Sequence, residues 1–81
     1  MTQAIVRRAL EAILEPLLDQ PDLLRINLLE VASSILAEIE VHPDDIPKII
    51  GKSGRTIGAI HIIMTNIGAK NKTRIRVLIN E

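Results

Sequence analysis

Two glycines, Gly51 and Gly54, interrupt the largely apolar segment IPKIIGKSGRTIGAI, residues 46–60. The apolar residues on either side recur at helical spacing, which predicts a short helix ending at Ile50 and a longer one from about Arg55 to Gly68. The longer helix has one expected core stripe: Ile57, Ile60, Ile63, Met64 and Ile67. Because glycine adopts backbone conformations that other residues avoid, the pair permits a sharp turn. The chain must therefore fold so that two consecutive helices meet at a tight corner.

A further helix is predicted at the start of the chain, capped by Thr2 and running to about Asp19. Its apolar positions follow the helical period: Val6, Ala9, Leu10, Ile13 and Leu17. Pro16 lies inside this pattern and has no N–H, so it should kink the last turn or end the helix early. The residues Gln20-Pro21-Asp22 then break the helix.

Three segments alternate apolar and polar residues, which predicts strands. The first covers residues 24–29 and the second residues 35–42, and a turn near Glu30 to Ser33 lets them pair as a hairpin. The third runs from Thr73 to Ile79. Asp44 is expected to cap the short helix, because Pro47 then falls at its third position, where no N–H is needed. The resulting order, helix, strand, strand, helix, helix, strand, belongs to the α+β class.

The composition is that of one small domain. The chain has 81 residues, 47% of them apolar, so residues 1–81 should share a single core. There is no cysteine, hence no disulfide and no thiolate metal site. Residues 1–46 hold three basic and nine acidic side chains, while residues 47–81 hold seven basic and one acidic. The two halves either neutralise one another in the fold or leave a basic patch for a polyanion.

The chain shows no sign of export or membrane insertion. Glu11 and Glu15 stand where a signal peptide needs an uncharged apolar run. The longest uncharged stretch, residues 56–69, is shorter than the ~20 apolar residues that span a bilayer. We expect a cytoplasmic protein that does not contact membranes.

The element order and the run I-I-G-K-S-G-R-T-I resemble the KH domain in its type II arrangement. In that arrangement a helix and a strand (here residues 1–30) precede the shared strand, helix, helix and strand (here residues 34–80). The resemblance implies a three-stranded sheet with three helices packed on one face. Together with the "DQPD" break, the segment VHPDDIPKIIGKSGRTIGAI is similar to the small bacterial single-KH proteins of the KhpA (YlqC) family.

The glycine turn has the chemistry of a phosphate site. Glycines let a sugar–phosphate chain approach the backbone, and the N–H groups of Gly54, Arg55 and Thr56 are expected to be free donors at a helix start. Lys52 adds a mobile charge, and KH domains clamp about four nucleotides with this loop. The resemblance implies single-stranded RNA as ligand, bound by Ile50, Gly51, Lys52, Ser53, Gly54, Arg55, Thr56, Lys70 and Lys72. The alternative is a glycine cap followed by a solvated turn.

Other candidate contacts are weaker. Arg74 and Arg76 alternate onto the open face of the last strand, where ion pairs with Glu38 and Glu40 of the neighbouring strand are favoured over phosphate contacts. The chain has no Phe, Tyr or Trp, which excludes aromatic stacking of the kind used by RRM and OB folds. With few contacts and no net positive charge, we expect modest affinity and limited sequence selectivity.

No enzymatic site is predicted, and neither a cofactor nor a metal is expected. The residues Gly51-Lys52-Ser53 match the end of a P-loop, but Ile46 occupies the position of the required upstream glycine. Ser53 has no evident base, and His42 and His61 lack ligand spacing.

The longer helix also has an uncharged face opposite its core stripe, between Arg55 and Lys70. Small residues around Ile62 would let a second helix approach, as in a two-fold homodimer. The predicted interface comprises Gly58, His61, Ile62, Thr65, Asn66 and Ala69; the alternative is a tolerated semi-polar surface. The KhpA resemblance implies self-association, pairing with a KhpB (Jag, EloR)-type KH protein, and a role as RNA chaperone or post-transcriptional regulator linked to cell elongation and division.

Overall fold

The computed structural model describes all residues from 1 to 81 and begins with helix α1 (Thr2–Leu14). Residues Glu15–Leu17 continue as a tighter 3₁₀ turn with Pro16 near its start. The expected early end at Pro16 is therefore confirmed, since this residue has no N–H to continue the α-helical ladder. Thr2, however, does not cap α1: it is the first helical residue and Met1 holds the cap position without a side-chain bond.

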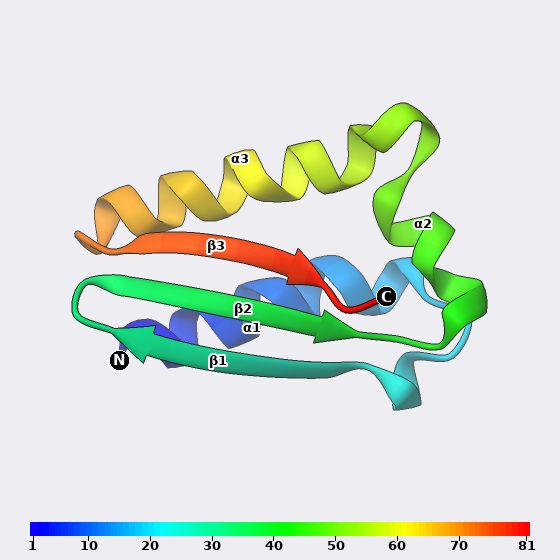
Figure 1. The fold of residues 1–81 in the computed structure, drawn as a ribbon, viewed down its shortest axis with the longest axis horizontal. Coiled ribbons are helices and arrows are strands. Elements are labelled where there is room, and N and C mark those ends of the chain that lie inside the picture. Colours follow the sequence, from blue (N-terminus) through cyan, green and yellow to red (C-terminus); the bar gives the residue numbers. More distant parts are fainter.

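The three strands are β1 (Arg25–Val31), β2 (Ser34–Glu40) and β3 (Arg74–Ile79). They form one sheet in the order β1-β2-β3 (Figure 1). β1 pairs with β2 in antiparallel fashion through a tight turn at Ala32 and Ser33, and β2 pairs with β3 in parallel. Parallel pairing requires a crossover connection, which α2 and α3 supply.

Helix α2 (Ile46–Ile50) is short and is followed by helix α3 (Arg55–Lys70). The predicted cap at Asp44 is wrong. This residue lies in a 3₁₀ turn (Pro43–Asp45), where its N–H donates to Nδ1 of His42 at 3.0 Å, and α2 begins only at Ile46. Pro47 consequently occupies the second helical position, where its missing N–H is equally harmless.

Asp45, the residue before α2, is a buried carboxylate that is 1% exposed. It accepts the backbone N–H groups of Asp19 at 3.3 Å and Gln20 at 3.0 Å, and Nζ of Lys48 lies 3.4 Å away. Burial by itself raises the pKa of Asp45, but these donors outweigh it and hold the pKa below the ordinary value of 3.8. The Asp45 carboxylate thus links the loop after α1 to the start of α2 by hydrogen bonds. It does not cap α2, because its side chain accepts no N–H of that helix.

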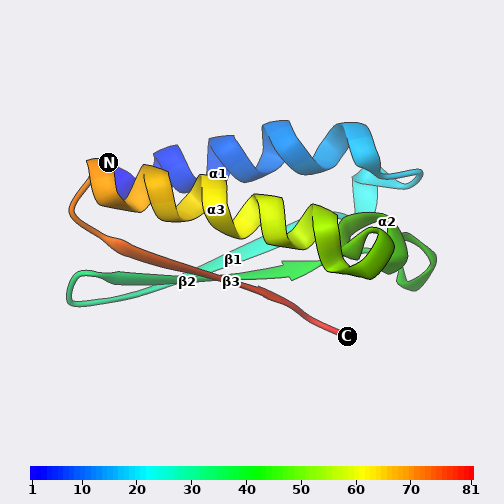
Figure 2. The same ribbon diagram turned by 90° about the horizontal axis from the view of Figure 1, so that it is seen from above.

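All helices lie on one face of the sheet, as expected for the type II arrangement. Figure 2 shows α1 and α3 side by side above the strands, with α2 at one end. The buried core is formed by Val6, Leu10, Leu14, Leu18, Ile26, Ile35, Ala37, Ile39, Ile49, Ile60, Met64 and Ile75.

The core stripe of α3 is narrower than predicted. Ile60 and Met64 are buried, Ile57 and Ile67 are half-buried, but Ile63 is 43% exposed. In Figure 1, α3 runs along the outer side of β3, beyond the edge of the sheet. Because the sheet covers only one side of the helix there, a residue on the flank of the apolar stripe stays in contact with solvent.

Candidate nucleic-acid interface

The glycine turn between α2 and α3 has the backbone that the sequence predicts. Gly51 and Gly54 have φ angles of 76° and 75°, in the region that favours glycine. A Cβ at Gly51 would collide with the side chain of Thr56, so this position admits no larger residue. Ser53 also has a positive φ of 56°. The turn therefore projects Lys52 and Ser53, both exposed, from the molecule.

The turn satisfies more of its own N–H groups than expected. Residues Lys52–Gly54 form a 3₁₀ turn in which the N–H of Gly54 donates to the carbonyl of Gly51 at 3.1 Å. The N–H of Arg55 donates to the carbonyl of Lys52. The prediction that these two are free donors is wrong, because the turn closes tightly enough to pair them. An anion at this corner would be held by the side chains and by the positive end of the α3 dipole.

The basic side chains after Lys48 have no carboxylate partners. The ion pairs of the structure involve only His42 with Asp44, and Lys48 with Asp19 and Asp45. The basic side chains after Lys48 are Lys52, Arg55, Lys70, Lys72, Arg74 and Arg76. All six are exposed, so Lys48 is the one residue of the basic half that forms ion pairs with the acidic half.

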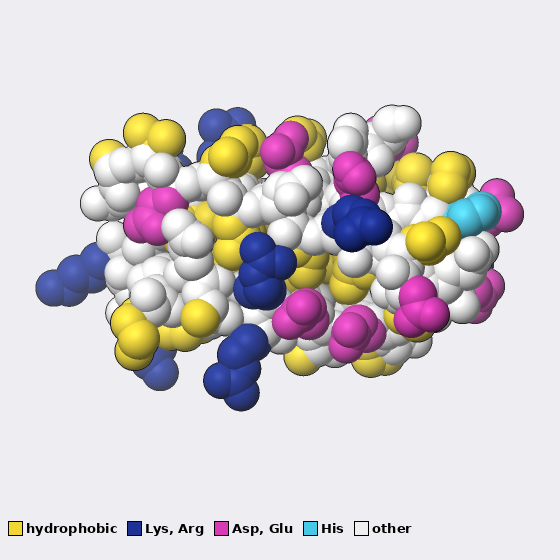
Figure 3. Space-filling model, turned by 90° about the horizontal axis from the view of Figure 1, so that it is seen from below, with side chains coloured by type: hydrophobic (Ala, Val, Ile, Leu, Met, Phe, Trp, Pro, Cys, Tyr) yellow, Lys and Arg dark blue, Asp and Glu magenta, His cyan; other side chains and the backbone are white.

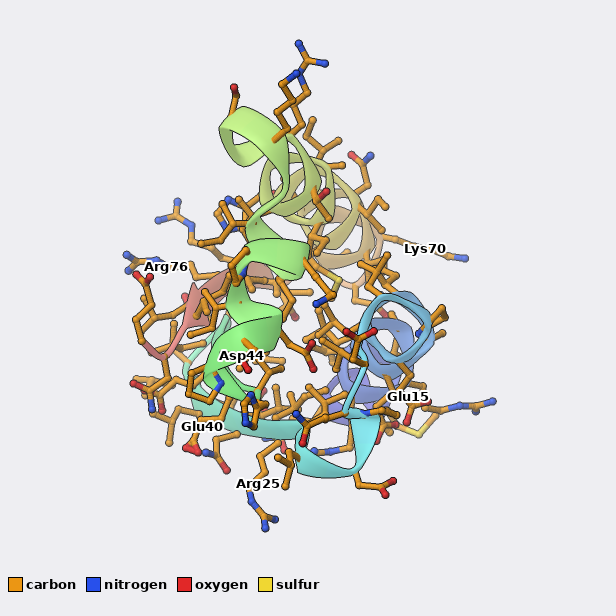
Figure 4. All side chains as sticks on the ribbon, turned by 90° about the vertical axis from the view of Figure 1, so that its right-hand side faces the viewer. Glu15, Arg25, Glu40, Asp44, Lys70 and Arg76 are labelled. Atoms are coloured by element: carbon orange, nitrogen blue, oxygen red, sulfur yellow. The ribbon has the colours of Figure 1, made fainter.

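The predicted ion pairs between the arginines of β3 and the glutamates of β2 are absent. In the parallel register Arg74 lies beside Ser34 and Arg76 beside Leu36, whereas Glu38 lies beside Leu78. The strands are therefore offset so that charges of opposite sign do not face one another. Figure 4 shows the Arg76 side chain on the outer side of the sheet.

A shallow groove runs between α3 and the free edge of β3. One part, of about 310 Å³, is lined by His61, Thr65, Ile75, Arg76 and Val77. The adjoining part, of about 340 Å³, is lined by Thr65, Gly68, Ala69, Lys72, Thr73, Arg74 and Ile75. Since α3 and β3 run in opposite directions (Figure 1), the groove extends from His61, in the first half of α3, to the loop between α3 and β3.

The loop that carries Lys70 and Lys72 lies at the far end of α3 from the glycine turn. A helix of 16 residues separates them, about 24 Å at 1.5 Å per residue. Lys72 lines the groove, whereas the Lys70 side chain in Figure 4 projects to the opposite side of α3 from Arg76. The structure therefore places Lys72 in the groove and leaves Lys70 outside it, while the glycine turn lies beyond the end of the groove that His61 marks.

The uncharged face of α3 is open. Ile62 is 65% exposed, and Thr65, Asn66 and Ala69 are exposed beside it. His61, Thr65 and Ala69 also line the groove, so three of the six predicted interface residues belong to both surfaces. This overlap depends on where β3 passes along α3, which helical periodicity does not reveal.

Three further shallow hollows, of about 260 to 360 Å³, lie outside this groove. No group of three His, Asp or Glu side chains is arranged to hold a metal ion. No helix is long and apolar enough to cross a membrane. On the face shown in Figure 3, acidic side chains predominate toward the α2 end, so a polyanion would be repelled from that half of the face.

Two helices joined by a G-K-S-G turn, packed on a three-stranded mixed sheet, define a KH domain in the type II arrangement. The family model for the KhpA/KhpB KH domain matches residues 7–79. The chain belongs to this family.

Several curated relatives resemble most of the chain. The RNA-binding protein KhpA of Mycobacterium tuberculosis (strain ATCC 25618 / H37Rv) is 36% identical over 67 residues, 83% of this chain and 84% of the relative. The RNA-binding protein KhpA of Halalkalibacterium halodurans is 36% identical over 72 residues, 89% of this chain and 95% of the relative. That of Chlamydia pneumoniae is 36% identical over 76 residues, 94% and 97% respectively. No solved structure matches the chain.

Proposed function

We propose that this protein binds single-stranded RNA, gripping about four nucleotides with the G-K-S-G turn. The observation that carries the proposal is the exposed turn itself, with unpaired Lys52 and Arg55 beside glycines that leave room for a sugar–phosphate backbone. The strand then follows the groove between α3 and β3 toward Lys72. The name of the relatives, RNA-binding protein KhpA, supports the same ligand.

The cellular role is proposed from the family resemblance. The protein acts in the cytoplasm as an RNA chaperone or post-transcriptional regulator linked to cell elongation and division. This is a binding role, without catalysis or a cofactor. It suits a groove that offers positive charge and backbone groups along an edge strand rather than an enclosed cavity.

The double variant Lys52→Asp with Ser53→Asp tests this proposal. It changes the charge of the turn by three units, each worth ~1 kcal/mol against a phosphate 4 Å away in water. Binding of an eight-nucleotide RNA should therefore weaken roughly hundredfold. The fold should persist because both side chains are exposed and aspartate tolerates the positive φ of Ser53.

A matched control makes the same change of charge elsewhere. The variant Ala4→Asp with Arg8→Asp places it on exposed positions of α1, away from the groove. This control should bind RNA within a few-fold of the parent, since only long-range screened charge is altered. If the turn variant binds as well as the control, with both folded by circular dichroism, the turn is not the clamp.

A second function is favoured by the exposed, uncharged face of α3 around Ile62. We propose that this face pairs with another KH domain, in a homodimer or with a KhpB (Jag, EloR)-type protein. Ile62 is 65% exposed on a helix face without charge, so its apolar side chain is in contact with water. Covering it with a second helix would remove this apolar surface from water. Pairing and RNA binding are compatible, because the glycine turn lies outside this face.

A further inference from the structure

His61 stands over the free edge of β3, at the end of the groove nearer the glycine turn. Its Nε2 lies 3.3 Å from the backbone carbonyl of Val77. A carbonyl oxygen only accepts, so this bond requires Nε2 to carry the hydrogen, which leaves Nδ1 of the neutral ring as an acceptor. At 3.3 Å the bond is long, so it orients the ring without locking it.

The edge of β3 beside His61 carries free backbone groups. The N–H of Arg74 bonds to Ser33 and that of Asn80 bonds to Ile39, both on the β2 side. Because backbone direction alternates along a strand, the N–H and C=O groups of Ile75, Val77 and Ile79 point away from β2, toward the groove. His61 already covers one of these carbonyls.

Arg76 completes the surroundings of the ring. Its side chain and His61 line the same part of the groove, about 310 Å³, together with Thr65, Ile75 and Val77. Both a histidine ring and a guanidinium plane are surfaces on which a nucleobase stacks. The walls of this pocket thus combine two flat groups, neither of them paired with a carboxylate, with a strand edge that offers donors and acceptors.

We infer that His61 and Arg76 form a base-binding slot and that His61 determines base preference in it. This inference rests on the proposed RNA-binding function and adds the residue that reads the RNA. The chain has no Phe, Tyr or Trp, and its other histidine, His42, accepts the N–H of Asp44 in the 3₁₀ turn before α2. His61 is therefore the single ring available to a base in the groove. Because purines present the larger stacking surface, the slot favours them.

The test compares single-stranded oligo(A) and oligo(U) of eight nucleotides, measured by fluorescence anisotropy on the full chain. The parent should bind oligo(A) more tightly. His61→Ala should weaken oligo(A) binding by about tenfold, as removal of an exposed stacking platform does, and weaken oligo(U) binding much less. His61→Phe, which keeps a ring but loses the bond to Val77, should stay within a few-fold of the parent on oligo(A).

The ratio of the two affinities separates base readout from other effects. Lys72→Ala should lower both affinities equally, because a phosphate contact carries no base information. A change of oligomeric state would likewise move both strands together. If His61→Ala lowers both affinities equally or neither, or if His61→Phe is as weak as His61→Ala, the slot does not exist. If the parent binds neither strand, the RNA-binding proposal itself is wrong.

Discussion

Two glycines of α3, Gly68 and Gly58, should respond to the same substitution with opposite signs. Gly68 is buried where α3 meets the start of β3, and its carbonyl accepts the N–H of Thr73 at 2.8 Å. A Cβ built at Gly68 overlaps the Thr73 carbonyl and reaches 3.3 Å from Cγ1 of Ile75. A Cβ built at Gly58 meets nothing within 4 Å. Comparing the two substitutions therefore separates the effect of helix propensity on stability from the effect of close packing, within one helix.

The magnitudes follow from these contacts. Alanine is favoured over glycine inside a helix by about 1 kcal/mol, so Gly58→Ala should stabilise the protein by up to that amount. Gly68→Ala gains the same term but forces a backbone carbonyl to move, and overpacking of this kind costs about 1–3 kcal/mol. Because the obstructing atom is backbone and cannot rotate away, we expect the upper part of that range and a net loss of about 1–2 kcal/mol.

Thermal unfolding monitored by circular dichroism measures both effects. A change of 1 kcal/mol moves the Tm of a domain this size by about 4–8 °C. Gly58→Ala should raise Tm by up to that interval, and Gly68→Ala should lower it by roughly 5–15 °C. A rise in Tm for both variants would mean that α3 and β3 do not approach closely at Gly68. The description of the groove between them would then be wrong.

Three further outcomes are expected. Ile62→Glu should give a folded monomer in sedimentation if the α3 face is the dimer contact, because two facing carboxylates would be desolvated together; a mutant that stays dimeric would place the interface elsewhere. Lys72→Ala should lower the slope of log K against log salt by about 0.7 unit, and an unchanged slope would remove this lysine from the RNA site. Asp45, whose pKa is lowered by the donors around it, stabilises the fold above its ordinary pKa of 3.8, and this contribution disappears as the pH falls through the lowered value. Asp45→Asn should therefore lower Tm at pH 7 and flatten the acid side of the Tm profile; an unaltered profile would contradict the role of Asp45.

The order of elements could be predicted because each one has a local signal. Alternation in β2 places Ile35, Ala37 and Ile39 in the core, as the structure confirms. Pro16 ends α1 by a property of its own ring, and the glycine turn needs the positive φ angles found at Gly51 and Gly54. Such features depend on residues a few positions apart, which a sequence displays directly.

What could not be predicted depends on contacts between distant segments. The position of Pro47 favours Asp44 as the cap by sequence, and only the return of the chain after α1 brings two N–H groups to Asp45. The ion pairs expected for Arg74 and Arg76 depend on which residues of β2 lie beside them, and the sequence does not give this register. In the structure Arg74 lies beside Ser34 and Arg76 beside Leu36, so neither faces a glutamate. Similarly, only the course of β3 along α3 shows that His61 borders a groove rather than an outward face alone.

His61 and Thr65 lie between the groove and the outward face of α3, so RNA binding and pairing of two copies take place side by side on this helix. A partner helix seated over Ile62 would border the groove without covering the glycine turn, so pairing would leave the phosphate clamp open. One groove holds few nucleotides and offers few charges, which limits the affinity of a single copy. Two joined copies convert the second contact into an intramolecular one, with an effective concentration set by the distance between the grooves. On this reasoning Ile62 contributes to RNA affinity without touching RNA, and loss of the dimer should weaken long strands more than strands that fill one groove.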